Sequence, residues 1–405
     1  MTICTVFLAI SPIFDPYLLA SLGSFSLKFL DLPMLIVAAL LVFAVGLRFS
    51  NQGKHSIFII ILLFAFFTMV SFLSGDENRS FSNALMNIAI EIVFAISVTL
   101  MWQSSSRELF VRIVSKVAFW ATIFLFIQYI AVNLGFTQIF NGKIPFLNMG
   151  KHDYWAALID PNTGDIRVHS IFQEPAYYGM YVLPVFASTL KNREHKKSVF
   201  YLLGLVLSSS LVAILGAVIV FVASLFFVRE NASVSKTIKN VVLVAIAAGL
   251  LTLLYTQVDF VRETIDYALE RTQSISGDLE DENLGSNKIR LLGYIDRFAE
   301  YPLFFKVFGV GSNQFSAYLG VTAYSNTIVS TILNYGIVGS VILLVCVFRW
   351  FKRVPANRIF LVVFVLVMAS DYQWMNWYFF YLISWIVLSE SYINAAVKLR
   401  ARKRS

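Results

Sequence analysis

Long apolar runs, separated by short polar or charged segments, are the main pattern along this chain of 405 residues. Most runs are close to the length of about 20 residues that an α-helix needs to cross the hydrocarbon layer of a membrane. The runs are continuous rather than alternating, which excludes a β-barrel, and lipid permits no other spanning structure than a helix or a closed barrel. The pattern therefore predicts a polytopic α-helical membrane protein.

The apolar runs predict about twelve membrane-spanning helices. Two runs are too long for one helix, and we interpret them as helical hairpins that turn at Ser208–Ser210 and at Asp371–Gln373. The first span is weak because Pro12 and Pro16 interrupt it. The predicted spans are 3–20, 30–47, 56–74, 81–101, 111–134, 175–190, two within 198–228, 240–258, 324–348 and two within 359–394.

Composition and charge support a single polytopic membrane domain, residues 1–405. Hydrophobic residues make up 58% of the chain and charged residues 14%, against about 25% charged residues in soluble domains. The net charge of +8 would suit a nucleic-acid partner. However, about two thirds of the Lys and Arg residues lie in the short segments that would be cytoplasmic, as the positive-inside rule requires. We therefore attribute the positive charge to the orientation of the chain in the membrane and expect no nucleic-acid partner.

This topology places both termini in the cytoplasm and two large loops, about 135–174 and about 259–323, on the outer face. Cys4 and Cys346 lie in apolar runs, so the outer loops contain no disulfide and no cysteine metal site. The N-terminus lacks a basic region and a cleavage site, so we expect a retained first helix rather than a signal peptide.

A polar cluster of Arg167, His169 and Glu174 lies in outer loop one, immediately before Pro175 opens the sixth span. Residues 154–160, a Pro-Asn-Thr-Gly turn and residues 165–172 predict a β-hairpin. On a strand, Arg167 and His169 would point the same way. A proline at the first helical position also leaves neighbouring N–H groups open to an anion. The cluster suits an anion site, and it equally suits a loop held by an Arg–Glu ion pair.

Outer loop two carries a second basic stripe, within a helix predicted at 286–300. Arg290, Tyr294 and Arg297 share one face of that helix, and guanidinium groups hold phosphate oxygens in pairs of hydrogen bonds. The alternative is ion pairing with Asp296, Glu300 or the acidic patch at 278–282. That patch resembles a weak metal signal but is more typical of a solvated run, so no metal site is predicted.

Glu91 lies near the middle of the fourth span. An ionisable group at that depth is costly, so Glu91 must face protein or a polar cavity. A structural hydrogen bond is favoured over a role in a transport pathway.

These motifs, taken in order, resemble the O-antigen polymerase (Wzy) and O-antigen ligase superfamily of bacterial membrane glycosyltransferases. The resemblance covers most of the chain in overall pattern, but its specific motifs span only about 165–340. They are Arg167-x-x-Ser170-x-Phe172-x-Glu174-Pro175, Arg290, Gly309-x-Gly311, Ser325-Asn326 and Tyr335-Gly336-Ile337-Val338-Gly339. The resemblance implies an all-α, GT-C-like fold in the bacterial inner (cytoplasmic) membrane, with the active face periplasmic or extracellular.

The resemblance also implies an enzyme that joins undecaprenyl-diphosphate-linked oligosaccharide units into O-antigen, capsule or exopolysaccharide, without a metal or cofactor. Arg167 and Arg290 would stabilise the leaving diphosphate, and Glu174 or else His169 would orient or deprotonate the attacking hydroxyl. The expected partners are the lipid-linked oligosaccharide, the bilayer, a chain-length regulator and a flippase. The residues expected to bind substrate are Arg297, Tyr294, Tyr324, Asn326, Ser170 and Gly311.

Two other functions remain open at this point. Ligases of the superfamily tend to carry a histidine where this chain has Ser325, which weakens the ligase interpretation. A lipid-oligosaccharide flippase is a different class, and such transporters commonly contain inverted repeats. The sequence shows no internal repeat, so a polymerase is favoured.

Overall fold

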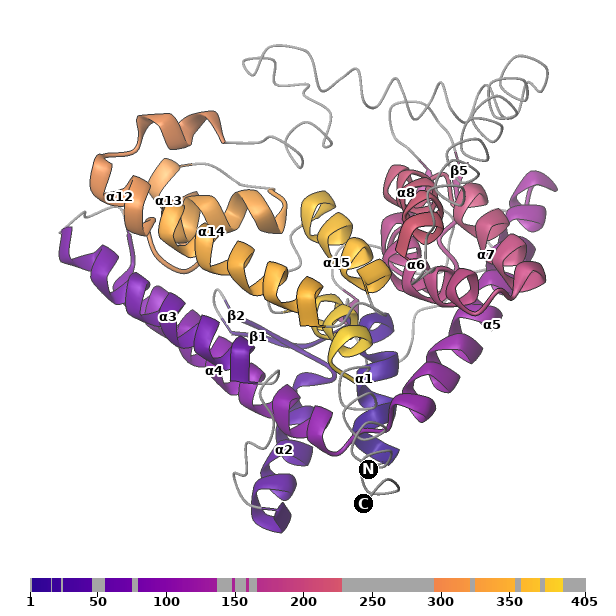
Figure 1. Cartoon of the computed structure of the whole chain (residues 1–405), viewed down its shortest axis with the longest axis horizontal. Helices are drawn as coiled ribbons and strands as arrows, with labels where there is room; N and C mark the ends of the chain where they lie inside the picture. Colours follow the sequence, from indigo (N-terminus) through magenta and orange to yellow (C-terminus); the bar gives the residue numbers. More distant parts are fainter. Residues whose placement is uncertain are drawn as a thin grey trace.

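A computed structural model describes most of the chain, and the described part is almost entirely helical (Figure 1). Among the described residues, three helices are long and apolar enough to cross a membrane: α4 (Phe81–Gln103), α5 (Arg107–Asn133) and Thr327–Arg349 within α14 (Thr327–Arg353). The structure describes residues 2–15, 17–22, 25–45, 55–74, 79–136, 148–149, 158–159, 166–227, 295–320, 325–353, 358–371 and 376–388.

Shorter helices make up the rest of the helical body. Every predicted span that falls on described residues contains a helix, whereas the predicted span at 240–258 lies outside them. The shorter elements are α1 (Thr2–Phe14), α2 (Asp31–Val45), α3 (His55–Ser71), η1 (Phe72–Ser74), α6 (Pro175–Lys191), α7 (His195–Leu207), α8 (Leu211–Phe227), η2 (Asp296–Glu300), α12 (Leu303–Phe308), α13 (Phe315–Leu319), α15 (Arg358–Ser370) and the helix Trp377–Leu388.

The first predicted span needs a correction, because its helix ends at Phe14. Residues 17–22 form strand β1 (Tyr17–Leu22), which pairs with β2 (Phe25–Lys28) and β3 (Asn148–Met149) in an antiparallel sheet of order β2-β1-β3. Pro16 explains the change, since it cannot continue the α1 hydrogen-bond ladder and the residue before a proline avoids helical geometry. The all-α prediction holds for the helical body but missed these short strands.

The predicted helical hairpin within 198–228 is confirmed. Ser208 caps the C-terminus of α7, Ser209 has a positive φ of 51°, and α8 begins at Leu211. The Ser209 conformation reverses the chain within three residues, and the Ser208 hydroxyl donates to the Leu205 carbonyl. A polar turn therefore divides an apolar run that was too long for one helix.

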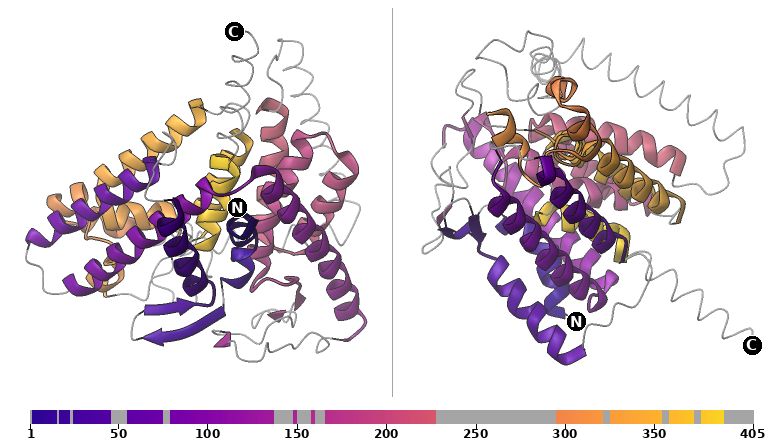
Figure 2. Two further views of the ribbon diagram at one scale, coloured as in Figure 1. Left: turned by 90° about the horizontal axis from the view of Figure 1, so that it is seen from below. Right: turned by 90° about the vertical axis from the view of Figure 1, so that its left-hand side faces the viewer.

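The helices form two groups that α15 and the helix Trp377–Leu388 join (Figure 2). One group contains α3, α4 and α14, and the other contains α6, α7 and α8 with α5 alongside. Every residue from Trp377 to Leu388 is buried, which fits a helix that is apolar on all sides. Trp102 of α4 donates to Ser384, and Tyr381 stacks on Tyr181 of α6 at 4.8 Å between ring centroids. This helix is therefore the centre of the core.

Candidate functional site

The segment that carries the predicted cluster of outer loop one is held against α5 by three buried hydrogen bonds. The backbone N–H groups of His169 and Ser170 both donate to Gln128 Oε1, at 3.0 and 2.8 Å. The Ser170 hydroxyl donates to the Ala121 carbonyl at 2.6 Å, and Ser170 has a positive φ of 60°. One amide side chain thus fixes the backbone immediately before α6.

The predicted hairpin in this loop is confirmed at the two residue pairs that the structure describes. Strands β4 (Leu158–Ile159) and β5 (Ile166–Arg167) are antiparallel, with Leu158 opposite Arg167. The strand ends at Arg167, however, so the alternation argument does not extend to His169. Arg167 is half-buried, whereas His169 is only 1% exposed.

Glu174 is the N-cap residue of α6, and Pro175 occupies the first turn as predicted. The backbone of Glu174 is extended, and its side chain forms no capping hydrogen bond. Within the described part of the chain, its half-buried carboxylate forms no ion pair with Arg167 or with any other cation. The structure therefore lacks the Arg167–Glu174 ion pair that was the alternative to an anion site.

The two glycine motifs of the sequence lie against each other. Helix α14 is broken at Gly336, where φ is 62° and ψ is −163°. A Cβ on Gly336 would lie 2.5 Å from the Val307 carbonyl oxygen, and one on Gly309 would lie 2.1 Å from the Asn334 carbonyl oxygen. Both positions need a positive φ and close backbone approach, which only glycine permits without strain. The Gly309–Gly311 turn therefore packs directly on the kink of α14.

Gly311 itself is buried between that kink and α3. Its N–H donates to the Asn334 carbonyl at 2.9 Å, and a Cβ would lie 3.0 Å from Ser71 Oγ. The neighbouring Ser312 hydroxyl donates to Glu91 Oε1 at 3.2 Å. Glu91 thus has the kind of hydrogen bond that a structural role requires.

Arg79, which the sequence did not single out, holds the same turn from the other side. This buried residue donates from Nη1 to the carbonyl oxygens of Ser71 at 3.1 Å and Val310 at 3.0 Å. Its guanidinium lies over the rings of Phe72 and Phe305, each 4.6 Å away. A buried arginine with paired donors and aromatic neighbours has a structural role here.

The remaining predicted residues divide into described and undescribed ones. Arg290, Tyr294, Tyr324 and the acidic patch at 278–282 lie outside the described residues, as does most of the helix predicted at 286–300. Arg297 is exposed in η2 and pairs with Glu300 at 3.2 Å, which was the structural alternative for that arginine. Nearby, burial raises the pKa of Tyr301 above its ordinary value.

Asn326 caps α14, since its Oδ1 accepts the Val329 N–H at 2.8 Å. The next residue, Thr327, donates from both its N–H and its hydroxyl to the Asp371 carbonyl at the end of α15, each at 3.0 Å. The start of α14 is thus joined to the end of α15.

The start of the last described helix contacts the start of α6. Tyr378, in the first turn of the helix Trp377–Leu388, stacks on Tyr177 in the first turn of α6, with ring centroids 5.1 Å apart. The backbone carbonyl of Glu174 accepts the Tyr177 N–H at 3.0 Å. The last described helix and α6 therefore begin side by side, at the same end of the helical body.

Three charged residues near this end were missed by sequence reasoning. Lys28 Nζ pairs with Asp15 at 2.6 Å, and the Lys28 N–H donates to the carboxylate of Asp31 at 2.8 Å. Asp15 is close enough to Tyr378 to interact electrostatically with it. Only the Asp-Pro break after the first helix could have marked this cluster in the sequence.

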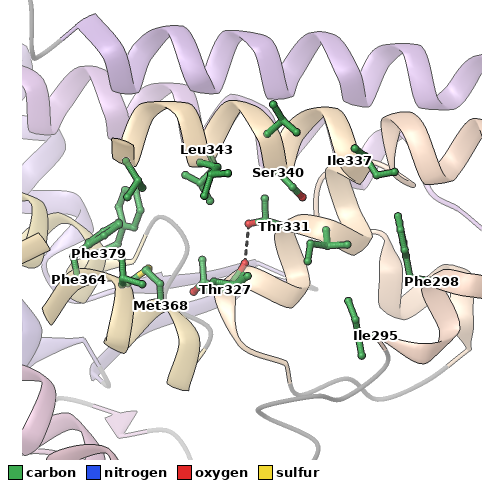
Figure 3. Close-up of a pocket in the computed structure, with 16 residues that line it drawn as sticks. Ile295, Phe298, Thr327, Thr331, Ile337, Ser340, Leu343, Phe364, Met368 and Phe379 are labelled. Atoms are coloured by element: carbon green, nitrogen blue, oxygen red, sulfur yellow. Dashed lines mark hydrogen bonds between the residues drawn. The ribbon is translucent and has the colours of Figure 1, made fainter. Parts of the chain in front are cut away.

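An apolar cavity of about 530 Å³ runs along α14, from Thr327 to Val347 (Figure 3). Ile295 and Phe298 lie at one end of it, and Phe364, Met368 and Phe379 lie at the other. Thr327 lines the cavity, so the polar contacts of Asn326 and Asp371 lie beside an apolar space. The arrangement offers a polar cluster next to a groove that an apolar chain can fill.

The described fold defines a helical protein whose three longest apolar helices have the length and composition of membrane spans. No protein-family model matches the chain, and a search of curated proteins finds no similar one.

Proposed function

We propose that this protein is a membrane glycosyltransferase that polymerises undecaprenyl-diphosphate-linked oligosaccharide units on the outer face of the bacterial cytoplasmic membrane. The observation that carries the proposal is the apolar cavity of α14 and α15, with the hydrogen-bonded Thr327 and Asp371 at its edge. A lipid-linked diphosphate sugar has the same two parts, a polar head and a long apolar chain. The type of reaction is inferred from the sequence resemblance to the O-antigen polymerase and ligase superfamily.

In this reaction a hydroxyl of the acceptor unit attacks the anomeric carbon of the donor chain. The new glycosidic bond forms as the bond from the anomeric carbon to the diphosphate oxygen breaks, and the electron pair of that bond leaves with undecaprenyl diphosphate. The hydroxyl proton passes to a carboxylate. Arg167 and Arg290 stabilise the charge that develops on the diphosphate, the kind of electrostatic stabilisation that needs no metal.

Glu174 is the better of the two candidate bases. Its carboxylate is half-buried and carries no ion pair with a described cation, so it is available to accept a proton. His169 is buried, and its backbone is held by Gln128. We therefore give His169 and Ser170 a role in holding the loop and give the proton transfer to Glu174.

The environment of Ser325 supports a polymerase over a ligase. At this position ligases of the superfamily tend to have a histidine. The Ser325 hydroxyl is buried and is engaged with the Ser330 hydroxyl and the Asn326 carbonyl. A serine bonded in this way provides no base, so the ligase chemistry lacks its expected group.

The test is an elongation assay on the purified protein with lipid-diphosphate repeat units. A ladder of product lengths supports polymerisation, and a single addition indicates a ligase. Movement of a fluorescent lipid-oligosaccharide across liposomes without a new glycosidic bond would identify a flippase. General-base catalysis is worth about 10²–10⁴-fold, so Glu174→Gln should slow elongation by about 100-fold or more.

Arg167→Ala and Arg290→Ala should each abolish elongation while membrane insertion is kept. Glu108→Gln is the matched control for Glu174→Gln, since Glu108 is an exposed carboxylate in the first turn of α5. Polymer of normal length from both arginine variants would overturn the site assignment. Elongation by Glu174→Gln at the rate of Glu108→Gln would overturn the choice of base.

A further inference from the structure

A second cavity, of about 500 Å³, lies at the other end of α6 from Glu174. It is lined by the first part of α5, the last two turns of α6 and the first turns of α7. Apolar side chains line part of it, namely Val111, Phe119, Val185 and Phe200. Polar groups from Ser115, Ser188, Thr189 and Asn192 line the remainder. The cavity therefore has an apolar part and a polar part.

The rim of this cavity carries an excess of positive charge. Lys116, Lys196, Lys197 and Glu194 all line it. The Glu194 carboxylate accepts Lys197 Nζ at 2.6 Å, so this pair is neutral. Lys116 and Lys196 form no ion pair with a carboxylate in the described part of the chain.

The start of α7 adds to this positive potential. The helix begins at His195, so its N-terminus lies at the same rim. The first N–H groups of a helix have no partner within it, and the helix dipole places positive charge at that end. An anion at this rim is therefore favoured by two lysines and by a helix terminus.

We propose that this cavity binds one anionic phospholipid of the cytoplasmic leaflet. The lipid phosphate lies between Lys116 and Lys196, and an acyl chain lies against Phe119 and Phe200. Basic pockets between helices on the cytoplasmic side of a membrane suit anionic head groups. The inference rests on the membrane orientation proposed above and not on the polymerase reaction.

The surface that surrounds the cavity favours a lipid over a soluble phosphate. Phe119 is 42% exposed, and Trp120 and Val199, on the same two helices, are 65% and 56% exposed. An acyl chain that leaves the cavity would meet these apolar side chains, whereas inorganic phosphate would use none of them. The apolar wall and the cationic rim together match a molecule with one phosphate and long hydrocarbon chains.

The experiment measures phospholipid retained by the purified full-length protein, using native mass spectrometry with phosphatidylglycerol or phosphatidylcholine added to the detergent. One bound phosphatidylglycerol is expected, with little phosphatidylcholine. A lysine near an anionic head group contributes about fivefold in affinity, so Lys116→Ala with Lys196→Ala should weaken retention by about 25-fold. Lys116→Arg with Lys196→Arg should retain the lipid.

Arg349→Ala is the matched control, because Arg349 is an exposed cation on α14 that does not line the cavity. It should leave phosphatidylglycerol retention unchanged. Should the double alanine variant fail to fold, the wild-type preference for phosphatidylglycerol must still fall as salt is added, since exposed charges are screened.

Three results would overturn the proposal. They are equal retention by the double alanine variant and the Arg349 control, equal retention of the two lipids, and a preference that salt does not change. If inorganic phosphate alone stabilises the protein as much as phosphatidylglycerol does, the ligand is a free phosphate and the lipid assignment is wrong. The lipid-retention assay contains no sugar substrate, so a negative result in it does not affect the polymerase proposal.

Discussion

Replacing Gln128 with alanine should destabilise the protein and disorder the segment that precedes α6. Gln128 is fully buried, and its Oε1 accepts the N–H groups of both His169 and Ser170. An unsatisfied buried donor costs about 1–3 kcal/mol. Gln128→Ala leaves two such donors without this acceptor, so the expected loss of unfolding free energy is about 2–6 kcal/mol.

The assay is reversible unfolding of the purified protein in mixed micelles, compared with Asn133→Ala. Asn133 is exposed on the same helix and donates to the Tyr129 carbonyl at 2.8 Å. Loss of an exposed hydrogen bond is compensated by water, so this control should change stability by less than about 0.5 kcal/mol. Elongation should also fall in Gln128→Ala, since Glu174 lies only four residues beyond Ser170. Equal stability of the two variants would refute the reasoning.

The other predictions concern the turn on the α14 kink. Arg79→Met removes the donor to the Val310 carbonyl and should cost about 2–5 kcal/mol of unfolding free energy. Gly336→Ala should destabilise the protein more than Gly320→Ala does in the same unfolding assay. Both glycines have a positive φ, but only a Cβ at Gly336 meets a backbone atom; equal losses would show that the contact is unimportant. Glu91→Gln keeps an acceptor for Ser312 and should retain elongation, whereas loss of elongation with unchanged stability would show that the carboxylate has more than a structural role.

Local features of the sequence were sufficient to place most of the helices. An apolar run of about 20 residues predicts a helix whatever surrounds it, because the length and composition belong to the run itself. The turn at Ser208–Ser210 and the proline at the start of α6 are also local, and both were predicted correctly. The hairpin of outer loop one was found for the same reason, since turn residues flanked by extended segments carry their own signal.

The tertiary structure decided which polar groups have partners. Gln128 lies within an apolar run, and nothing near it in the sequence indicates that it holds a segment more than 40 residues away. Arg79 is one cation in a short turn, yet it holds the Val310 carbonyl from across the chain. Hydrogen bonds between residues far apart in sequence leave no periodic pattern, so the sequence alone could not reveal them.

The two glycine motifs depend both on local sequence and on tertiary packing. The sequence by itself indicated a tight turn at Gly309–Gly311 and close helix packing around Gly336, because glycine adopts a positive φ without strain and has no side chain. Only the packing of one motif on the other, with carbonyl oxygens where side chains would stand, explains why no larger residue fits at either position. Conformational freedom belongs to a residue, whereas the space around it is set by segments that meet only after folding.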